Sequence, residues 1–237
     1  MSKIIAVCGS PNSGKTTLSL KLAQSIYFKE KKSVIYFSPD LEVPTLGFIF
    51  PHCKESDLYS LGTVLDKTDV FPEDVMKCVV TVKTMKNFGY LGYKAGENKY
   101  SYPRPTEDKI ISLLNCLREI ADYIIIDCSK DIISNMALSE SDAVVQLITP
   151  DLKSIVYYIS HKDKYEAYEN KAIKVINIKD RDIYLPVKEI KENFNKVEFI
   201  MPYSQSIKQQ CITGTLSEKL NDGKYNAIIS GVIEAVI

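Results

Sequence analysis

The chain has 237 residues, of which 45% are hydrophobic and 25% are charged, and its formal net charge at pH 7 is zero. These values are ordinary for a soluble globular protein, and the length is ample for one α/β domain with a large core. Zero net charge supplies no global basic field that would argue for nucleic acid or an acidic membrane as a partner, although a small basic patch could still exist in three dimensions. The sequence has neither an apolar run of transmembrane length nor a signal-peptide pattern, so we expect a cytoplasmic protein.

Apolar runs alternate with segments of helical periodicity along the chain. This alternation is typical of a three-layer, doubly wound α/β fold built on a mainly parallel sheet. The predicted strands are, in chain order, Lys3–Cys8, Ser33–Ser38, Asn87–Gly92, Tyr123–Asp127, Ala143–Thr149, Ala172–Ile178 and Val197–Ile200. The predicted helices are Lys15–Lys31, Glu107–Ala121, Asp151–Glu169 and Gly223–Val236. Because no linker or internal repeat divides the chain, we expect a single domain over residues 1–237.

A phosphate-binding motif joins the first predicted strand to the first predicted helix. Residues 9–16 read Gly-Ser-Pro-Asn-Ser-Gly-Lys-Thr and fit the pattern G-x-x-x-x-G-K-[ST] without a mismatch. Its two glycines allow a tight turn that points backbone N–H groups at phosphates. Lys15 would reach the β- and γ-phosphates, Thr16 would offer its hydroxyl to Mg²⁺, and the helix dipole would favour the anion. The sequence therefore predicts a P-loop NTPase that binds ATP or ADP with Mg²⁺. The residues expected to contact the nucleotide here are Gly9, Ser10, Asn12, Ser13, Gly14, Lys15, Thr16 and Thr17.

Two carboxylates stand at the ends of predicted strands. Asp127 ends the apolar run that begins at Tyr123, and Asp40 follows the strand Ser33–Ser38. The carboxyl ends of parallel strands are where ligands bind in such sheets. Asp127 would hold Mg²⁺ through a water molecule, and Asp40 could orient a water or a metal ligand. Capping a turn or a strand end is the alternative role for each.

Other conspicuous residues point to no further chemistry. The six cysteines contain no C-x-x-C pair, which favours buried free thiols in a reducing cytosol. His52 and His161 lie in no metal-ligating pattern. The polar, tyrosine-rich segment 93–102 predicts an exposed loop near the carboxyl ends of the strands.

Several later segments, in their order along the chain, resemble the MinD/ParA ATPases. They are Tyr123–Asp127, Asp142–Ser154, Val175–Asn177, and Phe199–Tyr203 followed by a segment that reaches Gly214. With the phosphate-binding motif, the resemblance covers nearly the whole chain. Within that group the chain is most similar to the CpaE/TadZ-type members associated with pilus and secretion-system assembly. The resemblance implies a nucleotide-driven switch, in which ATP holds two subunits face to face and hydrolysis releases them.

The resemblance also implies roles for individual residues. Asp40 would sense the γ-phosphate and position the attacking water, which makes Asp40 and Lys15 the candidate catalytic residues. Asn177 would hydrogen-bond the adenine edge, and Pro202 and Tyr203 would line the base pocket. A strand-to-loop turn is the alternative role for Asn177, and a place in the core is the alternative for Tyr203.

Two positions depart from the resembled pattern. The family's lysine after the first glycine, which reaches the partner subunit's phosphates, is Ser10 here, and an acidic residue common in that family is Ser38. A serine can hydrogen-bond a phosphate but brings no cation to stabilise transition-state charge. We therefore expect slow hydrolysis, and dimerisation by the usual route is in doubt. Lys130 and Lys94 are candidates to supply the missing cation.

Three functions remain open from the sequence. One is a Mg²⁺-dependent ATPase switch that forms a nucleotide-dependent homodimer and acts with a protein partner in an assembly or secretion system. Another is an ATP-binding scaffold with little or no hydrolysis, which Ser10 and Ser38 favour. The third is a small-molecule kinase or ligase, for which no substrate pocket is identified. The C-terminal segment Tyr225–Ile237 lacks the basic face of a membrane-surface helix, so we predict that it packs on the sheet.

Overall fold

The computed structural model describes residues 2–182, 184–194 and 196–237, and in this part of the chain one eight-stranded sheet runs through the protein. The strands are β1 (Lys3–Gly9), β2 (Val34–Ser38), β3 (Val80–Val82), β4 (Met85–Gly92), β5 (Tyr123–Asp127), β6 (Ala143–Ile148), β7 (Ala172–Asn177) and β8 (Val197–Met201). Their order across the sheet is β3-β4-β2-β5-β1-β6-β7-β8, and each neighbouring pair is parallel except β3 with β4.

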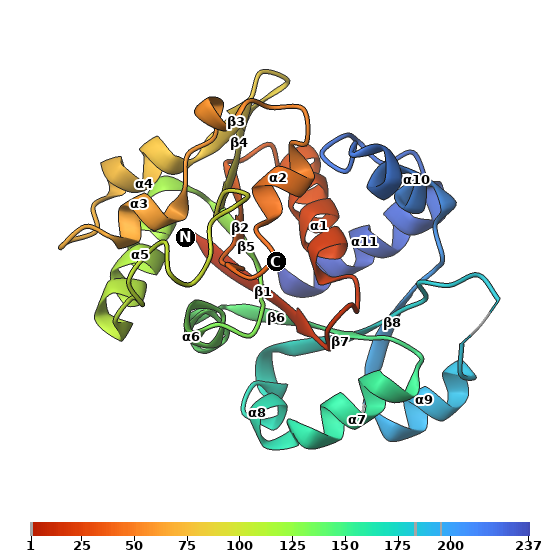
Figure 1. Ribbon diagram of the computed structural model, residues 1–237. Coiled ribbons are helices and arrows are strands. Elements are labelled where there is room, and N and C mark those ends of the chain that lie inside the picture. Colours follow the sequence, from red (N-terminus) through yellow and green to blue (C-terminus); the bar gives the residue numbers. More distant parts are fainter. Residues whose placement is uncertain (1, 183, 195) are drawn as a thin grey trace.

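Helices cover both faces of this sheet, as the doubly wound pattern predicts. Figure 1 shows α1, α10 and α11 over one face and α5 and α6 over the other. The helices of the described chain are α1 (Lys15–Glu30), α2 (Thr45–Ile49), α3 (Leu61–Leu65), α4 (Pro72–Cys78), α5 (Glu107–Ile120), α6 (Ile132–Glu140), α7 (Leu152–Ser160), α8 (Lys162–Glu166), α9 (Val187–Asn193), α10 (Gln205–Thr213) and α11 (Gly223–Val236). Two 3₁₀ turns lie at Glu55–Asp57 and Glu169–Lys171.

The central strands are continuous apolar runs because both of their faces are buried. Successive side chains alternate between the faces. On β1, Ile5 and Val7 join the core under α1 and α11, whereas Ile4, Ala6 and Cys8 join the core under α5 and α6. Helices thus pack against both faces of β1, and the phosphate-binding loop begins at the end of a strand that is held by both cores.

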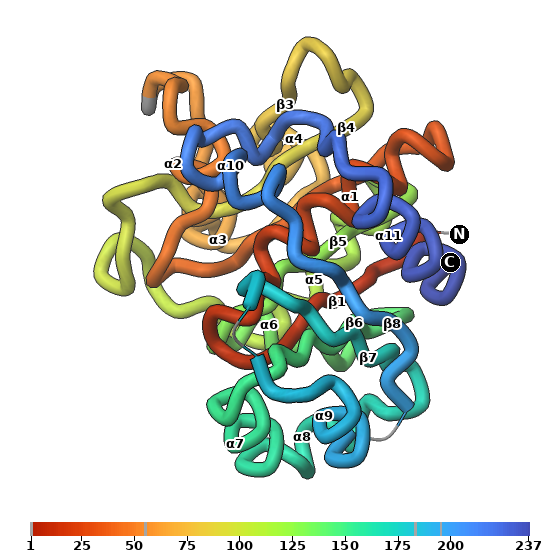
Figure 2. Tube along the Cα trace, turned by 90° about the vertical axis from the view of Figure 1, so that its right-hand side faces the viewer, coloured from red at the N-terminus to blue at the C-terminus, as the bar shows by residue number. Residues whose placement is uncertain are grey.

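The C-terminal helix packs on the sheet, as predicted. Tyr225, Ile229, Val232 and Ile233 are each at most 3% exposed, and α11 contacts both α1 and β8. Figure 2 shows the two ends of the described chain side by side. The Lys3 side chain donates a hydrogen bond to a carbonyl at that C-terminal end. Among the described helices, none has the length and apolarity needed to cross a membrane.

The helix predicted over Asp151–Glu169 is wrong in its continuity, because it breaks into α7 and α8 at His161. The His161 backbone has φ −124° and ψ 24°, which is not helical. Its ring stacks on Tyr157 at a centroid distance of 4.2 Å, and its Nδ1 lies 2.8 Å from the Tyr157 carbonyl oxygen. No glycine or proline marks this break, so the sequence carried no ordinary signal for it.

The seven predicted strands are confirmed, with boundaries that differ by a residue or two, but several short elements were missed. The missed elements are β3, α2, α3, α4, α6, α9 and α10. Each has nine residues or fewer, which is too short for a clear apolar period. Three of these helices still carry an N-cap, since Ser60 caps α3, Asp131 caps α6 and Ser204 caps α10 through side-chain hydrogen bonds.

The tyrosine-rich segment 93–102 is only partly the exposed loop that was predicted. It follows β4 at the carboxyl edge of the sheet, and Tyr100 is 84% exposed. Tyr93, however, is buried against Tyr102, because their rings pack at 6.3 Å. All six cysteines are free, as expected, and all are at least partly buried except Cys53, which is exposed.

Candidate functional site

The phosphate-binding loop runs from the end of β1 to the start of α1, and its conformation explains its residue types. Gly9 has φ 152° and Gly14 has φ 91°, which are values that residues with a Cβ rarely adopt. A Cβ at Gly9 would lie 2.4 Å from the Leu147 carbonyl oxygen, and one at Gly14 would lie 2.5 Å from Asn177 Nδ2. Asn12 has φ 60°, a left-handed conformation that asparagine tolerates. Both glycines are therefore required by the fold of the loop.

The motif's lysine and threonine make defined contacts. Lys15 Nζ donates to the Ser10 carbonyl oxygen at 3.0 Å, so the ammonium lies across the loop. Thr16 Oγ1 donates to Asp127 Oδ2 at 2.6 Å. The register of β1 and β5, which sets Val7 beside Asp127, brings this pair together although the residues are 111 positions apart. The structure thus joins the two halves of the predicted metal site.

Asp127 is a buried carboxylate with a raised pKa. Its residue is 4% exposed, and burial raises its pKa to about 6, against the lowering effects of Thr16, of the Lys15 charge and of Tyr36. The Tyr36 hydroxyl donates to Asp127 Oδ2 at 3.1 Å. Burial and the negative charge of Asp127 hold the pKa of Tyr36 well above its usual value. The hydroxyl therefore stays protonated and acts as the hydrogen-bond donor to Asp127. Tyr36 was missed in the sequence, where it reads as one apolar residue of a strand.

Asp40 lies on the segment between β2 and α2. Its Oδ1 accepts hydrogen bonds from the Glu42 and Val43 backbone N–H groups, both at 2.9 Å. This is the turn-capping role that the sequence left open. Burial raises the pKa of Asp40, and the two backbone N–H groups oppose that effect. The negative charge of Asp40 in turn raises the pKa of Asp127.

These groups share one open cleft of about 660 Å³. Its floor is the phosphate-binding loop, and Asp40 and Asp127 both line it. Lys130 and Lys164 line it as well, from the segment after β5 and from α8. A cleft of this size fits a nucleotide-sized ligand.

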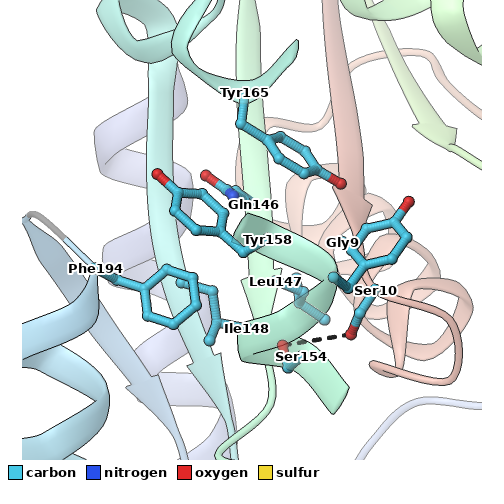
Figure 3. Close-up of a pocket in the computed structure, with 10 residues that line it drawn as sticks. Gly9, Ser10, Gln146, Leu147, Ile148, Ser154, Tyr158, Tyr165 and Phe194 are labelled. Atoms are coloured by element: carbon cyan, nitrogen blue, oxygen red, sulfur yellow. Dashed lines mark hydrogen bonds between the residues drawn. The ribbon is translucent and has the colours of Figure 1, made fainter. Parts of the chain in front are cut away.

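Ser10 points away from the cleft. Figure 3 shows its hydroxyl directed at Ser154 of α7, with an Oγ–Oγ distance of 3.4 Å. The side chain lies in a separate cavity of about 10 Å³, lined also by Tyr158, Tyr165 and Phe194. Ser10 is 5% exposed. Its contact within the loop is made by its backbone carbonyl, which accepts the hydrogen bond from Lys15. In this orientation the Ser10 hydroxyl does not face a phosphate bound in the cleft.

Among the described residues, those predicted at the base pocket are not part of the lining of the cleft. Asn177 ends β7, and its Nδ2 donates to the Ser13 carbonyl oxygen at 2.8 Å, so its amide holds the loop. Pro202 and Tyr203 follow β8, the neighbouring strand, and the Tyr203 hydroxyl donates to Gln205 Oε1 at 2.7 Å. Their roles toward an adenine base stay predictions.

Comparison with solved structures identifies proteins of similar fold. MinD of Pyrococcus horikoshii OT3, solved with Mg-ADP, has a TM-score of 0.75 at 16% identity, covering 100% of this chain and 96% of that chain. A ParA family ATPase of Chlorobium tepidum TLS has a TM-score of 0.71 at 14% identity, covering 98% of each chain. Apo McdA of Cyanothece has a TM-score of 0.73 at 18% identity, covering 100% of each chain. The chain has the fold of the MinD/ParA ATPases. Neither a protein-family model nor a curated protein sequence matches it.

The MinD/ParA fold implies Mg²⁺, and the residues present fit that ion. A threonine hydroxyl and a carboxylate oxygen 2.6 Å apart are oxygen donors of the kind that Mg²⁺ takes, with the remaining positions left to water and phosphate. The raised pKa of Asp127 indicates that its buried charge lacks sufficient compensation, which a cation would supply. No group of three His, Cys, Asp or Glu side chains within the described residues could hold a metal by itself. Thr16 and Asp127 are therefore the residues that would hold the ion.

The two lysines proposed from the sequence to replace the MinD/ParA lysine differ in position. Lys94 is not among the described residues that line the cleft, and its backbone N–H donates to Glu97. Lys130 lines the cleft but is exposed, with its Nζ 5.6 Å from the centre of the Tyr157 ring. Lys164, partly buried on α8, was missed. It belongs to no sequence motif, so only its position in the cleft distinguishes it from the other lysines of the chain.

Proposed function

We propose that this protein is a Mg²⁺-dependent, ATP-binding switch that hydrolyses ATP slowly and dimerises with nucleotide. The observation that carries the proposal is the contact between Thr16 and Asp127, made inside a cleft whose floor is the phosphate-binding loop. One more feature agrees. The Ser13 hydroxyl in that loop is fully buried and has no hydrogen-bond partner in the described part of the chain. An anion bound at the loop would supply an acceptor for it.

Each residue of the cleft has a part in this proposal. Lys15 would exchange the Ser10 carbonyl for phosphate oxygens, which are stronger acceptors for an ammonium group. Mg²⁺, when bound, would neutralise phosphate charge. Asp127 and Thr16 would hold that ion, with Tyr36 fixing the carboxylate. Asp40, on a capped turn over the cleft, would sense the terminal phosphate and orient water.

An apolar stripe supports contact with a second copy of the chain. Leu152, Val156 and Ile159 lie at helical spacing on α7 and are 68%, 60% and 64% exposed. Exposed apolar patches are common at protein interfaces. Two other residues of α7 reach the loop region, because Ser154 contacts Ser10 and Tyr157 lines the cleft. The stripe is thus on the helix best placed to couple nucleotide and partner.

A role in positioning or assembling a larger machine, such as a pilus or secretion system, rests on the sequence resemblance to CpaE/TadZ-type proteins alone. A MinC:MinD complex of Aquifex aeolicus has the same fold at 16% identity, and it illustrates a protein partner bound to a relative of this shape. We keep the machine and the partner as proposals.

A scaffold that binds ATP with little hydrolysis is the second candidate. The position of Ser10 favours it, because its side chain is neutral and faces Ser154 instead of the cleft. Without the lysine that MinD/ParA ATPases have at this position, the site stabilises the transition-state charge less. Nucleotide binding by calorimetry and phosphate release, both on purified protein, together with light scattering in ATP, in ADP and without nucleotide, separate the candidates. Turnover with an ATP-dependent dimer supports the switch, tight binding with no turnover supports the scaffold, and no binding overturns both.

A further inference from the structure

A second lysine lines the cleft of the phosphate-binding loop, and it comes from a segment that the motif does not include. Lys164 belongs to α8, is partly buried, and lines the same cleft as Lys15 and Asp127. Its Nζ donates to Asn135 Oδ1 of α6 at 2.6 Å. Asn135 is neutral, and no ion pair to Lys164 occurs in the part of the chain that the structure describes. Most surface lysines are solvated or paired with acids, so a lysine turned into a cleft beside a neutral amide is unusual.

The charge of Lys164 acts at the base of the loop. Burial raises the pKa of Cys8 to about 12, and the charges of Lys164 and Lys15 both oppose this rise. Cys8 directly precedes the loop, so the positive charges of both lysines act near the place where the loop begins. Lys164 thus lines the cleft together with the loop and Asp127, and its charge acts near the start of the loop.

The neighbouring residue fixes α8 in this position. Tyr165 is 5% exposed and stacks on Tyr158 with a centroid distance of 5.8 Å and an interplanar angle of 14°. The break at His161 makes α8 a separate five-residue helix, so its side chains do not continue the faces of α7. Lys162 on the same short helix is exposed and lies 3.5 Å from Glu166, which makes it a natural control.

We propose that Lys164 binds the terminal phosphate of ATP within its own subunit and supplies there a cation that Ser10 does not. This inference rests on the proposed nucleotide site. It assigns the second cation to α8 of the same chain, so ATP binding would not need a partner's lysine. Lys164 would leave the neutral Asn135 amide oxygen for charged phosphate oxygens, which are stronger acceptors for an ammonium group.

The test compares the affinities of ADP and of a non-hydrolysable ATP analogue by calorimetry with Mg²⁺. For Lys164→Gln we expect about tenfold weaker binding of the ATP analogue or more, and a change in ADP affinity of less than about threefold. Lys162→Gln should change neither affinity, and Lys164→Arg should keep most of the preference for ATP. A Lys164→Gln protein that binds the ATP analogue as tightly as the wild type overturns the inference.

A second variant separates a charge role from a tether between α8 and α6. Asn135→Ala removes the acceptor but leaves the Lys164 charge, so the affinity for the ATP analogue should stay equal or rise. If Asn135→Ala weakens binding of the ATP analogue by about tenfold, the lysine acts as a tether and the inference is wrong. Asn135→Ala keeps the inference testable even where Lys164→Gln folds poorly. If the wild-type protein binds neither nucleotide, the proposed function is overturned as well. If the wild type binds both and Lys164→Gln binds them equally tightly, only this inference is overturned.

Discussion

The Thr16 hydroxyl donates a hydrogen bond of 2.6 Å to Asp127, although the two residues are 111 positions apart in the sequence. The same carboxylate oxygen also accepts the Tyr36 hydroxyl at 3.1 Å. Two donors on one buried oxygen hold the carboxylate in a single orientation, and they lower its pKa against the larger effect of burial. A buried, oriented and under-compensated carboxylate is a costly feature for a fold, which is typical of sites kept for a ligand.

Asp127→Asn should stabilise the protein when neither nucleotide nor Mg²⁺ is present. The folded-state pKa of about 6 lies above the usual value of 3.8, so the native state binds the proton more tightly than the unfolded state does. Stability from this group is therefore lost as pH rises from about 4 to 6. The amide carries no such cost, and we expect a gain of about 2 kcal/mol at pH 7.5 and a smaller gain at pH 5. Urea unfolding at both pH values measures it, and an equal or lower stability at pH 7.5 would contradict the assignment.

Mg²⁺-dependent nucleotide binding should weaken as pH falls below about 6. Protonated Asp127 cannot act as a metal ligand, and its pKa of about 6 sets the midpoint. We expect the gain in affinity that Mg²⁺ provides to shrink by up to about tenfold per pH unit below this midpoint. Calorimetry with and without Mg²⁺ from pH 5 to pH 8 measures the effect. Asp127→Asn is the control, because it should lose the Asp127 step and leave only the titration of the phosphates.

Tyr36→Phe provides a matched check on that midpoint. It removes the hydroxyl that lowers the pKa of Asp127 and leaves the ring in the core, so the midpoint should move to higher pH. A midpoint that stays where the wild type has it would show that Tyr36 only fills space.

Two substitutions at Asp40 separate its turn from its chemistry. Asp40→Asn keeps an Oδ1 acceptor for the Glu42 and Val43 N–H groups, whereas Asp40→Ala removes it. If Asp40 orients water, both variants should lose about a hundredfold in turnover or more, while only the alanine variant should also lose about 1 kcal/mol of stability. Phosphate release and thermal unfolding measure the two effects. Turnover that survives in Asp40→Asn means that the residue is structural.

The sequence predicted the parts of this site that depend on local pattern. The loop from Gly9 to Thr16 and the strand ending at Asp127 follow from spacing and apolar runs, and so does the sheet that joins them. Tyr36 and Lys164 could not be found in this way, because their importance depends on register between strands and on a helix break at His161. The orientation of Ser10 is likewise a matter of tertiary packing, since Ser154 that it meets lies 144 residues away.

Binding of Mg-ATP to wild-type protein and to Lys15→Ala, measured by calorimetry, tests the central claim most directly. The ammonium that now rests on the Ser10 carbonyl would bind phosphate, so its loss should weaken ATP binding by about tenfold to a hundredfold. Lys29→Ala, an exposed lysine on the same helix, should leave the affinity unchanged. Wild-type affinity retained by Lys15→Ala would contradict a phosphate-binding role for the loop and, with it, the proposed function.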